Sequence, residues 1–209
     1  MARGSDRWLV GCLCGQAGYL RVVAGTVYFD LETQRSFRDV GGAPNKIDMG
    51  MSVGVTYSTE TEQFHIYGED QAEALVEQIM DADLVVGFNH VGFDYPVLEK
   101  YTILALGEQT KNCDMLLELE EVIGHRIKLD SVASATLGLG KTADGLDALK
   151  WWQKFKKTKD PSWLMKIAEY CCYDVKVTRE VYEFGKTEGI LRYEDKSGML
   201  QEITCPWAK

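Results

Sequence analysis

The sequence has no long apolar run. None of its hydrophobic stretches approaches the roughly eighteen residues that a membrane-spanning helix needs. A transmembrane segment is therefore excluded, and we expect no membrane partner.

Histidine and paired cysteine are also scarce. The three histidines are scattered, and none of the six cysteines forms a C-x-x-C pair. This spacing disfavours a zinc site and a disulfide framework. We therefore expect reduced thiols and a cytoplasmic location.

Basic residues are outnumbered by acidic ones, which gives the chain a net charge of −9. This balance argues against a protein that coats nucleic acid through a broad cationic surface. It does not exclude an enzyme that grips only a strand end. A cluster of carboxylates would contribute to the negative balance, and bound divalent cations would offset it locally.

The length of 209 residues suits one compact domain with a modest appendage. We expect a leader over residues 1–24, one domain over 25–190 and a C-terminal tail over 191–209. Residues 8–24 faintly resemble a secretory signal, but glycines interrupt the apolar core. A mobile leader is the favoured interpretation, with export as the alternative.

The hydrophobic pattern alternates first with the period of strands and then with the period of helices. It predicts strands at 26–33, 47–57, 63–67, 83–88 and 112–116. It predicts helices at 71–80, from Pro96 through Leu104, and at 129–137, 145–157 and 161–185. Three strands in a meander followed by alternating helix and strand indicate an α/β domain with a mixed sheet. The ligand site is expected at the carboxyl ends of its central strands.

Asp30 and Glu32 stand two residues apart in a strongly apolar strand. At this spacing both carboxylates project from the same face of the strand. Two like charges about 7 Å apart on a half-buried surface repel each other, and Mg²⁺ or Mn²⁺ would compensate them well. The alternative is a strand end at which both acids reach solvent.

Two further acids lie later in the chain. Asp94 follows a predicted strand and precedes a predicted helix, where an aspartate also serves as a helix cap. Tyr170 and Asp174 are four residues apart in the last long helix, so they share one face. Each feature alone has a purely structural alternative, but the predicted topology allows all of them to converge.

The order of these motifs resembles the DEDD superfamily of 3′→5′ exonucleases. D-x-E at Asp30 and Glu32, N-x-x-x-F-D from Asn89 to Asp94, and Y-x-x-x-D from Tyr170 to Asp174 look like its three exonuclease motifs. Glu169 stands where the histidine subclass has its histidine, so the chain is similar to the tyrosine subclass. Over residues 25–185 it particularly resembles the proofreading domain of family B DNA polymerases and stand-alone bacterial relatives. These families share a ribonuclease-H-like fold, which implies a five-stranded mixed sheet flanked by helices.

The resemblance also implies the chemistry. Two divalent ions, Mg²⁺ or Mn²⁺, would hydrolyse phosphodiester bonds at the 3′ end of single-stranded DNA or RNA, with DNA favoured. The implied metal ligands are Asp30, Glu32, Asp94 and Asp174, with Tyr170 as a fifth catalytic residue that orients the attacking water. The implied substrate contacts are Leu31, Thr33, Asn89 and Phe93.

Residues 150–159 interleave five lysines with three aromatic residues. Single-stranded nucleic acid is bound by such combinations. The favoured alternative is an amphipathic helix end that buries its tryptophans and places its lysines near the helix C-terminus.

Two other functions remain open. A non-catalytic ribonuclease-H-like module would bind nucleic acid without cleaving it. An endonuclease with a similar carboxylate site would cut a closed circular strand, on which an exonuclease cannot start.

Overall fold

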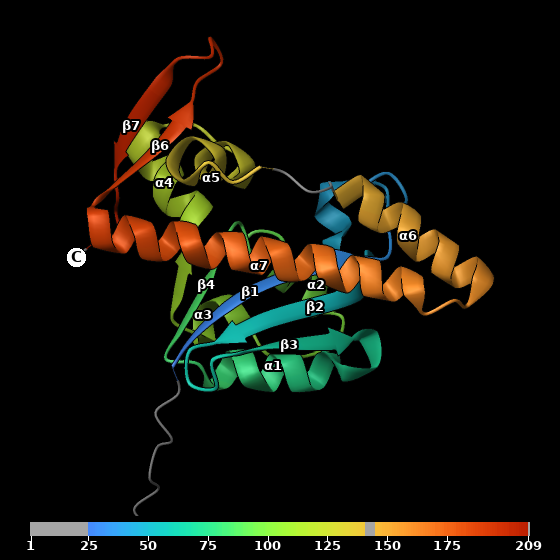
Figure 1. The fold of residues 1–209 in the computed structure, drawn as a ribbon. Helices are drawn as coiled ribbons and strands as arrows, with labels where there is room; N and C mark the ends of the chain where they lie inside the picture. Colours follow the sequence, from blue (N-terminus) through green and yellow to red (C-terminus); the bar gives the residue numbers. More distant parts are fainter. Residues whose placement is uncertain (1–24, 141–144, 209) are drawn as a thin grey trace, which may run out of the picture.

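A computed structural model describes residues 25–140 and 145–208 (Figure 1). The predicted leader over residues 1–24 lies outside the described residues. Within them, no helix combines the length and the apolar composition that crossing a membrane requires.

The described domain is built on a mixed sheet of five strands in the order β3-β2-β1-β4-β5. The meander β1 (Thr26–Thr33), β2 (Met51–Ser58) and β3 (Gln63–Gly68) pairs antiparallel. The strands β4 (Leu84–Gly87) and β5 (Asn112–Asp114) continue the sheet parallel to β1. This topology confirms the predicted fold class, and it makes β1 the central strand.

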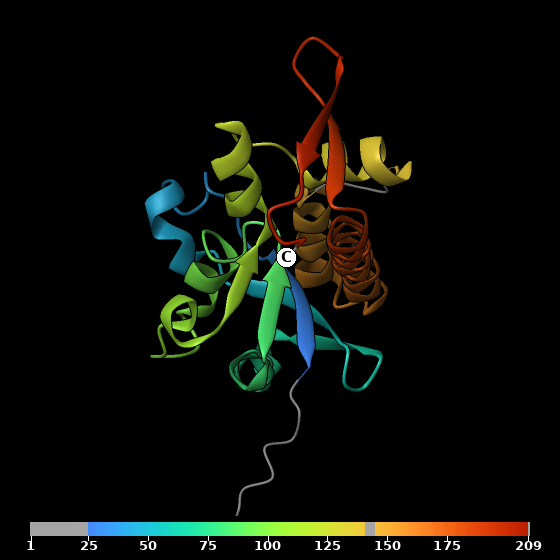
Figure 2. The same ribbon diagram turned by 90° about the vertical axis from the view of Figure 1, so that its left-hand side faces the viewer.

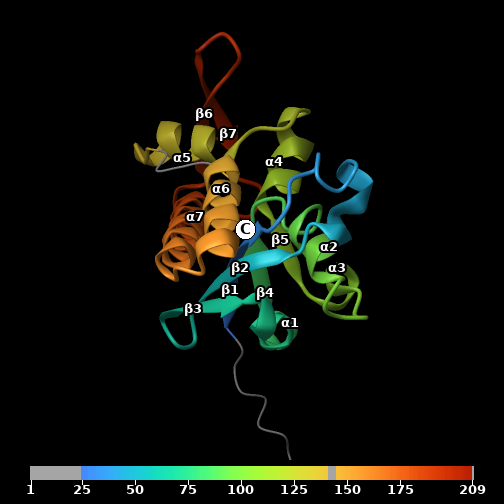
Figure 3. The same cartoon turned by 90° about the vertical axis from the view of Figure 1, so that its right-hand side faces the viewer.

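Helices cover both faces of the sheet (Figures 1 and 3). One face carries α1 (Ala72–Asp81), α2 (Asp94–Leu98) and α3 (Leu106–Gln109). The other carries α6 (Gly145–Thr158) and the long α7 (Ser162–Glu188). The helices α4 (Met115–Ile123) and α5 (Leu129–Leu137) lie beyond one end of the sheet.

The side chains of β1 alternate between two hydrophobic cores. Phe29 and Leu31 are buried in the core shared with α1 and α2, whereas Tyr28 is buried in the core shared with α7. Because side chains of a strand repeat every two residues, Asp30 and Glu32 share the face of Tyr28. The central strand therefore presents both acids to α7.

The second strand begins later than predicted. Residues Ala43–Asp48 form a 3₁₀-helix, and β2 starts only at Met51. Gly50 separates them with φ 67°, in the left-handed region that glycine adopts without strain. The predicted alternation from residue 47 was wrong because this turn interrupts it.

The helix predicted from Pro96 through Leu104 is also shorter. It begins at Asp94 and ends at Leu98, and the separate α3 starts at Leu106. The Tyr101 hydroxyl accepts from the Met51 amide and donates to Glu69. These tertiary contacts hold the chain after α2 in an irregular path.

The strand predicted at 112–116 ends at Asp114, where α4 begins. The Asp114 carboxylate accepts from the amides of Leu116 and Leu117 and so caps the helix. No helix was predicted over Met115–Ile123, since its apolar beginning continues the pattern of the strand.

The C-terminal residues form a hairpin of β6 (Ile190–Glu194) and β7 (Leu200–Thr204), which projects beyond α5 (Figure 2). Its residues Leu191 and Ile203 are buried in the core that α7 shares. Trp207 stacks on Tyr182 of α7 at 5.8 Å between ring centroids, and its indole N–H donates to the Tyr182 carbonyl. The residues assigned to a tail are thus packed against the domain.

Candidate active site

Three carboxylates from two elements meet between β1 and α7. Asp30 and Glu32 come from β1, and Asp174 comes from α7. One ligand oxygen of each residue can be chosen so that all three lie within 4.8 Å of one another. Residues more than 140 positions apart in sequence therefore form one cluster.

The packing of α7 on β1 sets the position of Asp174. The thiol of Cys171 contacts Asp30, with its sulfur 3.4 Å from the backbone oxygen and 3.5 Å from Oδ2. Twelve residues further along the helix, or just over three turns, the Tyr28 hydroxyl donates to the Glu183 carboxylate. These contacts fix both the rotation and the register of α7 over the strand. Asp174, three residues after Cys171, therefore faces Asp30 and Glu32.

Asp94 approaches the same place from the loop after β4. Its side chain is 3% exposed, and its Oδ1 accepts from the Leu31 amide at 3.2 Å. This bond ties the start of α2 to the centre of β1, between Asp30 and Glu32 in sequence. Asp94 is not part of the set of three within 4.8 Å, but it lines the same cavity.

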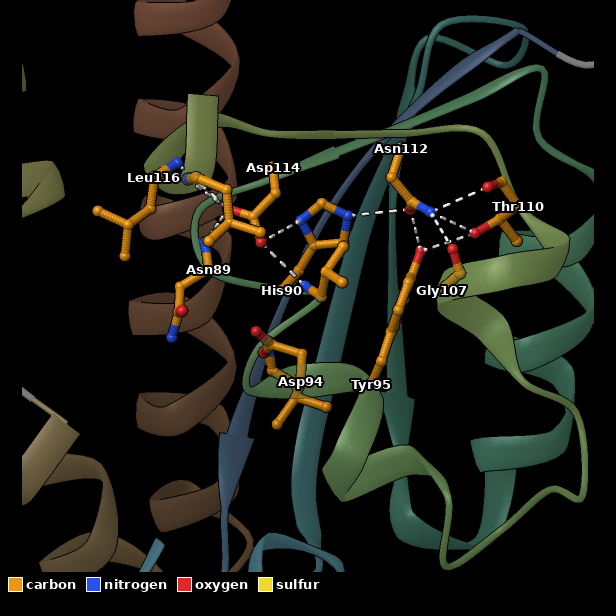
Figure 4. Close-up of polar contacts among 12 residues, drawn as sticks. Asn89, His90, Asp94, Tyr95, Gly107, Thr110, Asn112, Asp114 and Leu116 are labelled. Atoms are coloured by element: carbon orange, nitrogen blue, oxygen red, sulfur yellow. Dashed lines mark hydrogen bonds and ion pairs between the residues drawn. The ribbon is translucent and has the colours of Figure 1, made fainter. Parts of the chain in front are cut away.

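The loop that carries Asp94 is held by Asp114 (Figure 4). The two oxygens of Asp114 accept from the amides of Asn89 at 2.8 Å and Val91 at 3.0 Å. Asn89 adopts φ 70°, which an asparagine tolerates better than most residues. One buried carboxylate thus fixes both the loop and the start of α4.

A buried histidine fills the space behind this loop. His90 is fully buried, and its Nε2 lies 3.1 Å from Asn112 Oδ1, which also accepts from the Tyr95 hydroxyl (Figure 4). Burial lowers the pKa of His90, despite the opposing effect of the nearby Asp114 carboxylate. A Cβ at Gly87 would lie 2.7 Å from the His90 ring, so only glycine fits where the strand meets the loop.

The acidic cluster is electrostatically unfavourable as it stands. Burial raises the pKa of Asp30 well above its usual range, and the Asp174 carboxylate raises it further. Burial and the neighbouring acids likewise raise the pKa of Glu32, and burial and Asp30 raise the pKa of Asp94. Like charges held together out of water each favour the protonated form of the others.

Tyr170 lies beside the cluster on the face of α7 that it shares with Asp174. Burial raises the pKa of Tyr170 far above its usual range, and the carboxylates of Asp174 and Glu32 and a hydrogen bond to Asp174 add to this. The phenol is therefore a neutral hydrogen-bonding group at physiological pH. Its ring packs edge-on against Trp151 of α6, at 6.4 Å between centroids.

Two cavities of about 320 Å³ each meet at the cluster. Both are lined by Asp30, Asn89 and Asp174. The first also contains Glu32 and Asp94, and the second contains Tyr170. All five predicted catalytic residues thus line one or both of these two adjoining cavities.

The predicted substrate contacts also line the first cavity. The side chain of Leu31 is buried in the core shared with α1 and α2. The Thr33 hydroxyl donates a hydrogen bond to the Arg35 carbonyl. Phe93 pairs edge-to-face with Phe37 at 5.6 Å between centroids. Asn89 accepts a hydrogen bond from Arg126, 2.6 Å from its Oδ1.

Sequence reasoning missed several residues of the cavity wall. Phe37 and Leu146 line it although they are 41% and 63% exposed, and Leu149 lies beside them. Lys128 lines the second cavity. Motif spacing carries no signal for these residues, because loops and helices outside the motifs bring them there. Asp114 had a signal, since an aspartate before an apolar helical run is a common cap.

The donor set fits divalent cations. Carboxylate oxygens are the ligands that Mg²⁺ and Mn²⁺ prefer. The positive charge of such ions would relieve the repulsion between the carboxylates of the cluster. Among the described residues, no lysine or arginine forms an ion pair with Asp30, Glu32 or Asp94. The compensation that these buried acids need is therefore not supplied by those side chains.

Comparison with known proteins identifies the superfamily to which the chain belongs. A family model described as the RNase H superfamily matches residues 27–184. A comparison with curated proteins finds no match. Among solved structures, the chain is similar to the family B DNA polymerase from the hyperthermophilic archaeon Pyrobaculum calidifontis, with a TM-score of 0.58 and 17% sequence identity. The similarity covers 77% of this chain and 24% of the polymerase, so the chain spans about a quarter of that protein's length.

The polymerase supports the fold alone, whereas the family model matches well over half of the chain and agrees with the mixed sheet and its flanking helices. The chain belongs to the RNase H superfamily.

Proposed function

We propose that the protein is a metal-dependent 3′→5′ exonuclease of the DEDD superfamily, tyrosine subclass. The observation that carries this proposal is the set of Asp30, Glu32 and Asp174 oxygens within 4.8 Å of one another. Tyr170, which forms a hydrogen bond with Asp174, is the reason for assigning the tyrosine subclass. The substrate is a single-stranded 3′ end, and DNA is favoured because the similar fold belongs to a DNA polymerase.

The carboxylates would hold two divalent ions, Mg²⁺ or Mn²⁺. By the family resemblance, Asp30 would be shared by both ions, with Glu32 and Asp174 on one ion and Asp94 on the other. When bound, such ions neutralise phosphate charge and lower the pKa of an attacking water. That positive charge would favour the ionised form of the carboxylates, whose pKa values are raised by burial and by one another.

The remaining residues position the reactants. The neutral Tyr170 hydroxyl is a hydrogen-bonding group beside Asp174 and would orient the attacking water. Phe93 and Phe37 provide an apolar wall for the terminal base, and Asn89 provides an amide at the junction of the two cavities. The Leu31 amide donates to Asp94 Oδ1 and so orients the carboxylate that would bind the second ion.

The test is digestion of matched DNA and RNA oligonucleotides, labelled at either end, with Mg²⁺ and then Mn²⁺. We expect a 5′-labelled strand to shorten stepwise and a 3′ label to be released as a mononucleotide. Asp30→Asn and Asp174→Asn should abolish this activity. Asp81→Asn, an exposed aspartate at the end of α1, is the matched control and should retain it.

The same assay separates the alternatives. Cleavage of a closed circular single strand would indicate an endonuclease. Binding without cleavage under every metal would indicate a non-catalytic module. Activity that survives in both aspartate variants would remove the basis of the proposal.

A further inference from the structure

The exposed face of α6 carries lysines that the proposed chemistry does not use. Residues 150–166 contain six lysines and one aspartate, a net charge of +5. The rest of the chain then carries −14 against −9 for the whole. The positive charge of an acidic protein is thus concentrated on one helix and the start of the next.

The aromatic residues of this segment belong mainly to the core. Trp152 is buried, and Trp151 and Phe155 pack against the core that α7 shares. These aromatic side chains thus belong to an amphipathic helix that packs them against the core, as the sequence favoured. They are therefore not free to stack on bases. The lysines of the segment, by contrast, are exposed.

The lysines share a face of α6 with the wall of the active-site cavity. At 100° per residue, Lys154, Lys156 and Lys157 lie with Leu146 and Leu149 within an arc of about 160° around the helix axis, and Lys156 is next to Leu149. The buried Ala148 and Trp152 lie outside this arc. Leu146 and Leu149 line the first cavity. Lys154 follows Leu146 by eight residues, or about 12 Å along the axis. The half of the helix surface that carries these lysines therefore runs from the cavity to the end of α6.

These lysines are exposed and available. Lys154, Lys156 and Lys157 are all exposed, and within the described part of the chain none forms an ion pair. Lys154 and Lys166 hold their ammonium groups 4.3 Å and 4.9 Å from the centroid of the Trp163 ring. The negative end of the helix dipole favours lysines only in the last turn, so it does not account for Lys154.

We propose that Lys154, Lys156 and Lys157 form a track for the phosphate backbone of single-stranded nucleic acid, on the 5′ side of the nucleotide in the cavity. This inference rests on the proposed function, because it assigns the path of that substrate. Phosphates are the partner that a local excess of lysine selects on an otherwise acidic surface. The track also offsets the repulsion that the strand meets from the rest of the protein.

The experiment compares the full chain with Lys154→Gln/Lys156→Gln/Lys157→Gln. We expect the KM for a long single strand to rise about tenfold, with kcat nearly unchanged. Hydrolysis of a dinucleotide, which occupies only the cavity, should stay the same. Strand binding, measured by fluorescence anisotropy without metal, should show a salt dependence whose log–log slope is about 2 shallower, since each phosphate contact contributes about 0.7.

Two matched variants complete the design. Lys111→Gln/Lys186→Gln/Lys196→Gln removes three exposed lysines elsewhere, of which Lys186 lies about 35 Å along α7 from Trp163, and it should keep the wild-type KM and salt slope. The triple variant Lys154→Arg/Lys156→Arg/Lys157→Arg keeps the positive charge, so it should bind the strand as the wild type does and not as the glutamine variant does.

Equal loss in the distant triple variant, an unchanged salt slope, or an equal loss on the dinucleotide would overturn the track. If the wild type cleaves no strand, the exonuclease proposal fails, while the anisotropy measurement still tests the track by itself.

Discussion

At the scale of single residues, the acidic cluster couples proton binding to folding. The pKa values of Asp30, Glu32 and Asp94 are raised in the folded chain, mainly by burial. Between their ordinary pKa values, about 4, and the raised ones, the folded chain holds more protons than the unfolded chain. The metal-free protein therefore loses stability as pH rises through this window.

The Asp30→Asn variant tests this coupling. In EDTA its melting temperature at neutral pH should exceed that of the wild type, because the amide carries no buried charge. Its stability should also fall less between about pH 5 and about pH 8. Mn²⁺ should raise the melting temperature of the wild type and leave that of the variant nearly unchanged. A variant that melts below the wild type in EDTA would contradict the account.

Tyr170→Phe removes only the hydroxyl beside Asp174. Because the ring still packs against Trp151, the fold and metal affinity should be retained. The loss of the hydrogen-bonding group should lower kcat about 100-fold. Single-turnover hydrolysis and calorimetric Mn²⁺ titration check both parts. Unchanged kcat would show that this hydroxyl does not orient the reacting water.

At the scale of elements, the junction between β5 and α4 supports the site. Asp114 accepts from backbone amides of the loop after β4 and of the first turn of α4. One side chain thereby connects a strand, a helix and the loop that delivers Asp94.

Asp114→Ala should lower the free energy of unfolding by about 3 kcal/mol, because it removes a helix cap and leaves two partly buried loop amides without a partner. Urea denaturation measures the loss. Asp81→Ala, at the exposed end of α1, should change stability by less than about 0.5 kcal/mol. Equal stability of the Asp114 variant and the wild type would rule out this supporting role.

Elements with a clean period were predictable from sequence. The alternation of β1 and the helical period of residues 129–137 gave their observed bounds. By contrast, Met115–Ile123 follows β5 without a break, and only the bonds of Asp114 decide where the strand ends. The stretch after Leu98 lost its helix to tertiary contacts of Tyr101 that no local pattern contains.

At the scale of the whole molecule, the convergence of the four acids could be predicted because their order along the chain is compatible with the topology. The wall around them could not, because Phe37 and Leu146 reach the cavity through a loop and a separate helix. The C-terminal hairpin has short strands around a turn at Asp195, and its role became apparent only from the burial of Leu191 and Ile203.

The hairpin should unfold together with the domain. Ile203 is 2% exposed, so Ile203→Ala should cost about 3 kcal/mol. Leu200, which is 60% exposed, is the control, and its alanine variant should lose less than about 0.5 kcal/mol. Urea unfolding followed by tryptophan fluorescence and by circular dichroism should give one coincident transition. A separate early transition would show that the hairpin is an independent appendage.

The proposed two-metal site can be tested by a crystal structure of the full chain with Mn²⁺ and a single-stranded oligonucleotide, with manganese located by its anomalous scattering. We expect two manganese peaks between Asp30, Glu32, Asp94 and Asp174, with the 3′ end of the strand beside them. A saturated crystal without manganese at these carboxylates, or with the strand bound elsewhere, would contradict this expectation.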